Sequence, residues 1–421
     1  MNRENGLERA LIIGLLLPYV ERWEVEDSLD ELGLLADTAG AQVVDRIVQN
    51  RNRVDPTFYI GRGKAEALAI LCQEQDIDLV IFDADLSTAQ HRNLEKTIKT
   101  KIVDRSGLIL DIFARRARTK EAKTQVELAQ LQYLLPRLPR QWPHLSRQVG
   151  GIGTRGPGET QLEVDRRRVR RRISVLARTL SEIEKERKVQ RKSRKGMFRT
   201  VLVGYTNSGK STLLNNLSRA SHAFVEDRLF ATLDSLTRVM ELPPNHRVLV
   251  TDTVGFIRKL PHHLIASFHG TLDEVREADL LLHVVDVSHP NFEEQILIVE
   301  RTLVELEAAD KPILKVLNKV DKVNGGFLRR IRQKYRGGIP TSALNGWGIN
   351  ELRSAIAGYV RREYITLELE IPQREARLLS RIRNRGEMLE EEYRGDEVLL
   401  KVQLRKIDAE KMGLVERNVE R

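Results

Sequence analysis

Short runs of consecutive hydrophobic residues, separated by helical patterns, mark the first part of the chain. Two of these runs, ALIIGLLL (10–17) and DLVIFDADL (78–86), have the length and composition of buried strands. Between and beside them, LDELGLLADTAG (29–40) and KAEALAILCQEQ (64–75) are typical of amphipathic helices. The alternation predicts a small α/β subdomain over residues 1–115.

Residues 116–195 show a helical pattern with a long interruption. A first helix is predicted over about 119–138, where closely spaced prolines end it. After a glycine-rich connection (140–161), hydrophobic residues recur at alternating intervals of four and three from Val169 onward, as in a coiled-coil seam. The second helix is expected to run to about Lys195. We expect the two helices to form an antiparallel hairpin.

From residue 196 the pattern returns to strands that alternate with helices. The strand-like runs are FRTVLVG (198–204), RVLVTD (247–252), DLLLHVVDV (279–287), PILKVLN (312–318) and GIPTSA (338–343). They predict a parallel-rich sheet over 196–362 with helices on both faces. After Arg362, a strand–helix–strand pattern predicts a small α/β C-terminal domain over 363–421. The fold class is therefore α/β throughout, apart from the hairpin.

Composition limits the class of protein. About 41% of the 421 residues are apolar, which is enough for packed cores. The one cysteine, Cys72, cannot form an internal disulfide, fits a reducing cytosol, and is interpreted as a small buried hydrophobe rather than a catalytic thiol. No run approaches the ~18 apolar residues that span a bilayer. The N-terminal ALIIGLLLPYV is interpreted as a strand and not as a signal peptide, so we expect a cytoplasmic protein.

Positive charge is concentrated in one segment. The whole chain carries a net charge of +10, yet residues 136–200 alone contain 19 Lys/Arg against 6 Asp/Glu. The rest of the chain is therefore slightly acidic. Such a local excess is the electrostatic signature expected for a polyanionic partner. A solvated basic face on a coiled coil is the alternative.

The sequence GYTNSGKS (204–211) fits the phosphate-binding loop GxxxxGK[ST] completely. It follows a predicted strand and opens a predicted helix, which is the context that the motif requires. Backbone N–H groups of such a loop converge on polyphosphate. Lys210 is expected to contact the β- and γ-phosphates, and Ser211 to supply an oxygen ligand to Mg²⁺.

Three further motifs follow predicted strands in order. In DTVG (252–255), Asp252 can hold Mg²⁺ through its water shell, and the Gly255 N–H can reach the γ-phosphate. In NKVD (318–321), the Asp321 carboxylate can accept two hydrogen bonds from guanine, which adenine cannot donate. TSA (341–343) offers backbone N–H groups to the guanine oxygen.

A switch segment is expected between the phosphate loop and DTVG. The candidates there for a ligand to Mg²⁺ and the γ-phosphate are Thr232 and its competitor Thr237. We assign catalytic roles to Lys210, Thr232 and Gly255. The predicted nucleotide contacts are Gly204, Tyr205, Thr206, Asn207, Ser208, Gly209, Lys210, Ser211, Leu229, Phe230, Ala231, Thr232, Leu233, Asp252, Thr253, Val254, Gly255, Asn318, Lys319, Val320, Asp321, Thr341, Ser342 and Ala343.

These motifs resemble those of the HflX-type GTPases, in the Obg-HflX group of translation-factor-related P-loop GTPases. The residues that carry the resemblance are GYTNSGKSTLLNNL, LFATLD, DTVGFI, NKVD, TSAL and the loop GGIGTRGPGET (150–160) with the following QLEVDRRRVRRRI. The resemblance covers about residues 10–365. The family pattern favours Thr232 over Thr237 as the switch threonine. One departure from the pattern is Ser235, where the family commonly has proline after the aspartate.

The resemblance implies a GTPase that binds the large (50S) ribosomal subunit and splits or recycles stalled ribosomes. A GTP-gated rRNA-binding factor in 50S assembly or storage is the alternative. GTP is the expected substrate and Mg²⁺ the expected cofactor, and we expect a monomer that contacts neither membrane nor DNA. The charge map supports an RNA partner, with candidate contacts at Arg147, Arg155, Arg166, Arg167, Arg168, Arg170, Arg171 and Arg172.

Two residues suggest how hydrolysis is controlled. Phe256 follows Gly255 where many switch GTPases carry a glutamine that orients water, so we expect slow intrinsic hydrolysis. Asn207 could help to coordinate a monovalent cation such as K⁺ beside the phosphates. It could equally close the loop through local hydrogen bonds.

Overall fold

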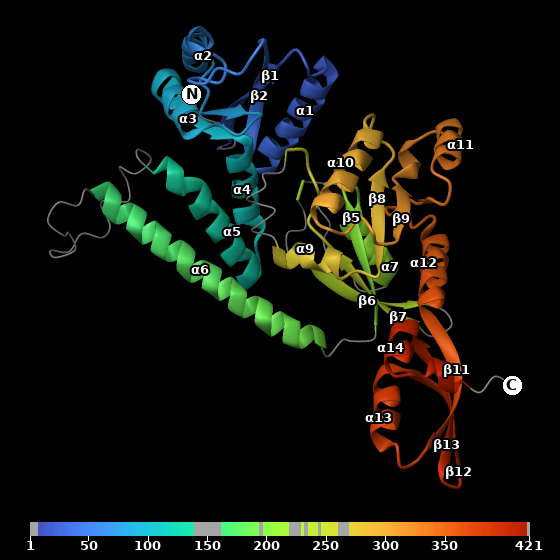
Figure 1. Ribbon diagram of the computed structural model, residues 1–421. Helices are drawn as coiled ribbons and strands as arrows, with labels where there is room; N and C mark the ends of the chain where they lie inside the picture. Colours follow the sequence, from blue (N-terminus) through green and yellow to red (C-terminus); the bar gives the residue numbers. More distant parts are fainter. Residues whose placement is uncertain are drawn as a thin grey trace. The chain divides into compact units, whose positions relative to one another are not determined.

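The computed structural model describes residues 7–138, 161–192, 197–218, 229–230, 235–242, 246–259 and 269–418. Its contacts group into two compact units. The first unit comprises Met1–Glu184, Val225–Ser235 and Thr253–Asp273, and the second comprises Lys185–Phe224, Leu236–Asp252 and Glu274–Arg421 (Figure 1). The α/β fold class with a parallel-rich sheet is confirmed, whereas the division into four domains stays a prediction. In the described residues, no helix combines the length and apolar character needed to cross a bilayer.

The N-terminal part is a four-stranded, wholly parallel sheet with strand order β2-β1-β3-β4. Helices α2 and α3 cover one face through a core that includes Leu68 and Leu94. Helix α1 packs closely at Gly14 of β1, where an added Cβ would lie 2.9 Å from the Leu29 side chain. The elements are β1 Glu8–Leu16, α1 Arg22–Thr38, β2 Ala41–Asn50, α2 Arg62–Glu74, β3 Leu79–Phe82, α3 Thr88–Ile98, β4 Lys101–Asp104 and α4 Arg105–Arg116.

The middle part contains the two helices that the sequence predicts, α5 (Lys120–Leu134) and α6 (Gln161–Lys192), with the short 3₁₀ helix η1 (Leu135–Arg137) after α5. The α5 N-terminus is capped by the Thr119 hydroxyl, which accepts a hydrogen bond from Ala122 N. The two helices lie side by side (Figure 1). An ion pair joins them, with Arg172 Nε 2.7 Å from Glu127 Oε1. The predicted hairpin contact is thus present.

The second sheet has six strands in the order β10-β9-β8-β5-β7-β6, parallel except for the edge pair β6–β7. Its core contains side chains of α7 and α12 on one face, and a smaller cluster joins α10 and α11 on the other. The elements are β5 Phe198–Gly204, α7 Lys210–Ser218, β6 Leu236–Leu242, β7 His246–Asp252, α9 His269–Arg276, β8 Leu280–Asp286, α10 Phe292–Glu305, β9 Ile313–Asn318, η3 Val320–Lys322, α11 Gly325–Lys334, β10 Ile339–Pro340 and α12 Ile349–Glu363.

The C-terminal part is an antiparallel three-stranded sheet with strand order β11-β13-β12. Alternating residues of β11 and β13 form its core with Leu379 and Ile382 of α13. The elements are β11 Tyr364–Pro372, α13 Ala376–Arg385, β12 Glu387–Arg394, β13 Glu397–Arg405, α14 Lys406–Lys411 and η4 Val415–Arg417. The strand–helix–strand prediction omitted β12.

Candidate nucleotide-binding site

The predicted phosphate loop lies between the buried strand β5 and helix α7. Gly209 has a left-handed φ of +94°, and a Cβ added there would lie 2.3 Å from the Asn318 amide nitrogen. Only glycine satisfies both conditions. The Ser208 hydroxyl is buried and has no hydrogen-bond partner among the described residues. A glycine that leaves the loop backbone open to a ligand, beside a buried hydroxyl without a hydrogen-bond partner, is what a phosphate-binding loop requires.

Lys210 is buried at the first turn of α7. Its ammonium donates to the carbonyl oxygens of Gly204 at 3.1 Å and Tyr205 at 2.8 Å. Burial lowers the pKa of Lys210 to about 8, an effect that the Asp252 carboxylate opposes and Lys319 reinforces. The ammonium is still protonated at neutral pH and so keeps the positive charge that phosphate binding needs.

Two of the three residues expected near Mg²⁺, Ser211 and Asp252, lie in contact. The Ser211 hydroxyl donates to Asp252 Oδ2 at 2.6 Å, although 41 residues separate them in the chain. Hydroxyl and carboxylate oxygens are ligands suited to this hard cation and its water shell. Thr237, the competitor for the switch threonine, lies in β6 and its hydroxyl is 2.9 Å from that of Thr251. Thr232 lies outside the described residues, so its preferred role stays a prediction.

Asn318 ties three predicted motifs together. Its amide nitrogen donates to the Ser208 carbonyl at 2.8 Å, and its amide oxygen accepts from Ala343 N at 2.9 Å and from the Thr341 hydroxyl at 3.3 Å. Asn318 is almost fully buried. Its side chain therefore fixes the phosphate loop against the NKVD and TSA loops.

Lys319 and Asp321 face different surroundings. Lys319 has a left-handed backbone, and its ammonium is 2.8 Å from Asp286 Oδ2 at the end of β8. The Asp321 side chain is exposed, so its carboxylate is accessible to a base. Thr341, Ser342 and Ala343 are all buried, and Val320 N donates to Thr341 O at 3.2 Å, which joins the two loops.

The remaining switch residues group with the first unit. Phe230 stacks edge-on against Phe113 of α4, with ring centroids 4.7 Å apart. Leu229, Thr253, Val254, Gly255 and Phe256 are buried. Ala231 and Leu233 lie outside the described residues.

The structure describes six of the eight arginines predicted to contact RNA, and their role stays a prediction. Arg147 and Arg155 lie outside the described residues. Arg167, Arg168, Arg170 and Arg171 are exposed on α6 and Arg166 is half-buried. Arg172 is exposed too, but it is engaged by Glu127, so part of its charge is already compensated.

Two residues that support the loops of the site were not predicted from the sequence. Asp286 orients Lys319, and the Asn216 amide donates to the Ala343 carbonyl. A carboxylate at the end of the β8 run was a visible signal for Asp286. Nothing in the sequence marks Asn216, because its partner is 127 positions away.

Comparisons with known proteins agree with this geometry. Family profiles described as 50S ribosome-binding GTPase, GTP-binding GTPase N-terminal and GTP-binding GTPase Middle Region match residues 199–319, 26–114 and 116–194. A GTPase HflX from Caldanaerobacter subterraneus subsp. tengcongensis is 46% identical over 388 residues, which cover 92% of this chain and 88% of the relative. The chain belongs to the HflX family of GTPases. The GTPase HflX of Escherichia coli is 43% identical over 384 residues, covering 90% and 89% of the two chains.

As an HflX-family GTPase, the chain binds GTP and hydrolyses it to GDP and phosphate. Among solved structures, a GTP-binding protein of Sulfolobus solfataricus in complex with GDP is 25% identical and is matched over 85% of this chain and 99% of that chain, with a TM-score of 0.43.

Proposed function

We propose that this HflX-family GTPase binds the 50S subunit through ribosomal RNA and couples GTP hydrolysis to the splitting and recycling of stalled ribosomes. The observation that carries the proposal is α6, whose exposed arginines occur in the same chain as a GTP site. The family profile matched by residues 199–319 is described as a 50S ribosome-binding GTPase, which supports the same partner. A monomeric, cytoplasmic protein fits this role.

In this proposal, each residue of the site has a separate role in binding the phosphates or Mg²⁺. Lys210 neutralises charge on the β- and γ-phosphates, and the Gly255 N–H donates to the γ-phosphate. Ser211 and Thr232 hold Mg²⁺, with Asp252 in contact with the Ser211 hydroxyl at 2.6 Å. The ion supplies positive charge to the phosphates when it is bound.

In this proposal, hydrolysis depends on the ribosome because Phe256, directly after Gly255, cannot orient the attacking water through its side chain. Phe256 is 3% exposed and has no hydrogen-bonding group in its side chain. We also propose that the Asn207 amide oxygen helps to coordinate K⁺. The left-handed backbone at Asn207 (φ 59°) is one that asparagine tolerates well. Equal turnover in potassium and sodium at matched ionic strength, with ribosomes present, would reject the K⁺ site.

The deciding experiment is sedimentation of intact ribosomes on a sucrose gradient with the purified protein and GTP. We expect conversion into subunits, and GTP turnover that rises on adding ribosomes. The Lys210→Ala variant, which lacks the phosphate contact, serves as the control and should leave ribosomes intact. Binding to 50S subunits without splitting would instead favour the assembly or storage role.

A further inference from the structure

One segment of the second unit carries positive charge and no negative charge at all. From Lys322 to Asn350 the sequence contains no aspartate or glutamate. The same segment contains six basic residues, namely Lys322, Arg329, Arg330, Arg332, Lys334 and Arg336. All six are exposed. They lie on, or next to, helix α11 (Gly325–Lys334).

The helix separates its apolar and basic residues. Ile331 is buried, and Leu328 and Tyr335 pack in the same cluster with Phe292 and Ile296 of α10. These positions follow the spacing of one helical face. Arg329, Arg332 and Gln333 are exposed on the other side, and Arg336 follows directly after the helix. We call Arg329, Arg332 and Arg336 the α11 arginines.

The acidic groups of the neighbouring helix do not neutralise the α11 arginines. Glu293 of α10 is 2.6 Å from the Lys334 ammonium, and Glu300 is 3.0 Å from that of Lys315. In the part of the chain that the structure describes, no ion pair involves the α11 arginines or Lys322. The C-terminal part contains both paired and unpaired arginines. Arg383, Arg385, Arg394, Arg405 and Arg417 are each paired with a carboxylate, whereas Arg374, Arg377 and Arg381 form no ion pair among the described residues.

Folding does not explain this arrangement. Cations in the last turn of a helix interact favourably with its dipole, which accounts for Arg332 and Lys334. The dipole does not account for Arg329 in the middle of the helix. Like charges three positions apart, such as Arg329 and Arg332, destabilise a helix slightly. The basic side of α11 therefore slightly lowers the stability of the folded protein unless a partner supplies negative charge.

We propose that the α11 arginines form a second RNA-contact surface, which binds the phosphodiester backbone of ribosomal RNA independently of α6. Arginine is suited to phosphate because its planar fork donates two hydrogen bonds to it. No large hydrophobic side chain between Lys322 and Arg336 is exposed, so the face lacks the apolar contacts of a membrane-binding helix. The proposal rests on the proposed ribosome binding and assigns it a further surface.

The test uses the full chain with Arg329→Gln, Arg332→Gln and Arg336→Gln combined. The matched control is Arg374→Gln, Arg377→Gln and Arg381→Gln. These exposed arginines, on or just before α13, also form no ion pair among the described residues, and their replacement changes the net charge equally. Co-sedimentation with 50S subunits is measured across a salt series. The α11 variant should bind roughly tenfold more weakly, with a salt slope lower by about two to three. The control should bind like the wild type, and both should keep GTP affinity.

Each other outcome is decisive. Equal losses in the two variants would show a general charge effect and overturn the proposal, as would wild-type binding by the α11 variant. If the wild-type protein itself does not bind 50S subunits, the proposed function is rejected, and the α11 proposal is rejected with it.

A second measurement separates RNA from an acidic protein as the partner. Gln333→Cys places a thiol on the exposed face, whereas the native Cys72 is buried. An iron chelate attached to Cys at 333 in the bound protein should cleave ribosomal RNA in one confined region. Absence of RNA cleavage, with crosslinking to a ribosomal protein from the same position, would replace RNA by protein and overturn the proposal.

Discussion

Lys210 combines a buried position with a charge that the reaction needs. Its folded pKa of about 8 lies below the ordinary value of 10.5 because burial disfavours the ammonium. Phosphate favours the charged form. Bound GTP should therefore raise this pKa, and binding above pH 8 should be accompanied by proton uptake.

We predict that GTP affinity falls as the pH rises through about 8, since the free protein then loses the Lys210 proton. Calorimetric titration at pH 8.5 in two buffers of different ionisation enthalpy measures the uptake directly. Lys210→Arg, whose guanidinium stays protonated, should remove the proton uptake. Binding at pH 8.5 without any proton uptake by the wild type would contradict the shifted pKa.

Asp321 and Asn318 belong to one motif, but substitutions at the two positions should have different effects on nucleotide binding. Asp321 is exposed, whereas Asn318 is buried and holds three loops together. Asp321→Asn should weaken GTP binding by about 1–3 kcal/mol and improve xanthosine triphosphate, whose oxygen can accept from the new amide. Asn318→Ala should weaken both nucleotides, because the loops lose their common anchor. Competition binding with the two triphosphates distinguishes these results, and an unchanged preference in Asp321→Asn would reject the assignment.

The residue types of the site were predictable because each motif needs a fixed local spacing. The hydrogen bonds between motifs were not. Asn318 and Ser208 are 110 positions apart, and Ser211 and Asp252 are 41 apart. Such pairs depend on which strands are neighbours, and the order β9-β8-β5-β7 cannot be derived from local patterns.

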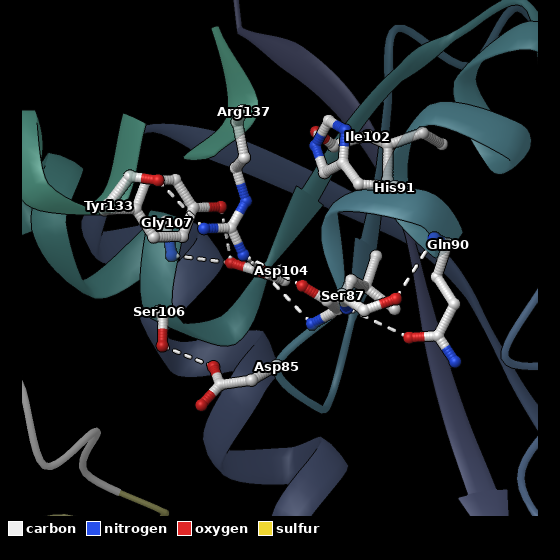
Figure 2. Close-up of polar contacts among 11 residues, drawn as sticks. Asp85, Ser87, Gln90, His91, Ile102, Asp104, Ser106, Gly107, Tyr133 and Arg137 are labelled. Atoms are coloured by element: carbon white, nitrogen blue, oxygen red, sulfur yellow. Dashed lines mark hydrogen bonds and ion pairs between the residues drawn. The ribbon is translucent and has the colours of Figure 1, made fainter. Parts of the chain in front are cut away.

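At the scale of elements, a single carboxylate joins the end of one strand to three helical segments. Asp104 is fully buried at the end of β4 (Figure 2). It accepts hydrogen bonds from Gly107 N of α4 at 2.8 Å, from the Tyr133 hydroxyl of α5 at 2.7 Å and from Arg137 of η1 at 3.1 Å. Arg137 also lies over the Tyr133 ring, 3.8 Å from its centroid. The cluster anchors the start of the hairpin to the N-terminal sheet.

We predict that Asp104→Asn destabilises the protein by about 3–5 kcal/mol, since the Arg137 guanidinium loses its buried partner. Tyr133→Phe removes one hydrogen bond and should cost only about 1–2 kcal/mol. Urea unfolding gives the two free energies, and hydrogen exchange should show faster exchange in α5 for Asp104→Asn. Equal free energies of unfolding for the two variants would show that the Asp104–Arg137 ion pair does not stabilise the protein.

Elements with a clear hydrophobic run were predictable, and elements without one were not. The runs gave β1, β3 and the strands β5, β7, β8 and β9. β12 (EMLEEEYR) has no buried side chain and exists because it pairs with β13. β2 is an edge strand whose side chains are mostly exposed or half-buried, so it lacks the pattern of a central strand.

At the scale of the molecule, the structure groups Val225–Ser235 and Thr253–Asp273 with the N-terminal residues. The contacts responsible include Phe230 with Phe113 and the Lys259 ammonium 2.6 Å from Asp83 Oδ2. Asp83 is also bound by Arg105. Burial by itself would raise the pKa of the Asp83 carboxyl, but the Arg105 and Lys259 cations outweigh it and hold this pKa below its ordinary value. A sequence pattern cannot reveal this grouping, because contacts up to 176 positions apart create it.

The hairpin has two basic parts, the arginines of α6 and the loop from Gln148 to Thr160, and we predict that they have separate roles. The α6 arginines should supply the larger, salt-sensitive part of ribosome binding. Replacing Arg170 and Arg171, which are exposed, should therefore weaken binding and flatten its salt dependence. Replacing Arg172 should also loosen the contact with Glu127, so it is less suitable for this test.

The loop from Gln148 to Thr160 lies outside the described residues, and its role is predicted from sequence. Five glycines and Pro157 give it no means of forming a core, whereas Arg155 could contact RNA phosphate or stack on a base. Shortening the loop to a tight turn should leave folding, GTP binding and much of the ribosome affinity intact, yet abolish splitting. Co-sedimentation and a splitting assay on the same variant measure both effects. Splitting at the wild-type rate by the shortened protein would show that the loop only connects the two helices.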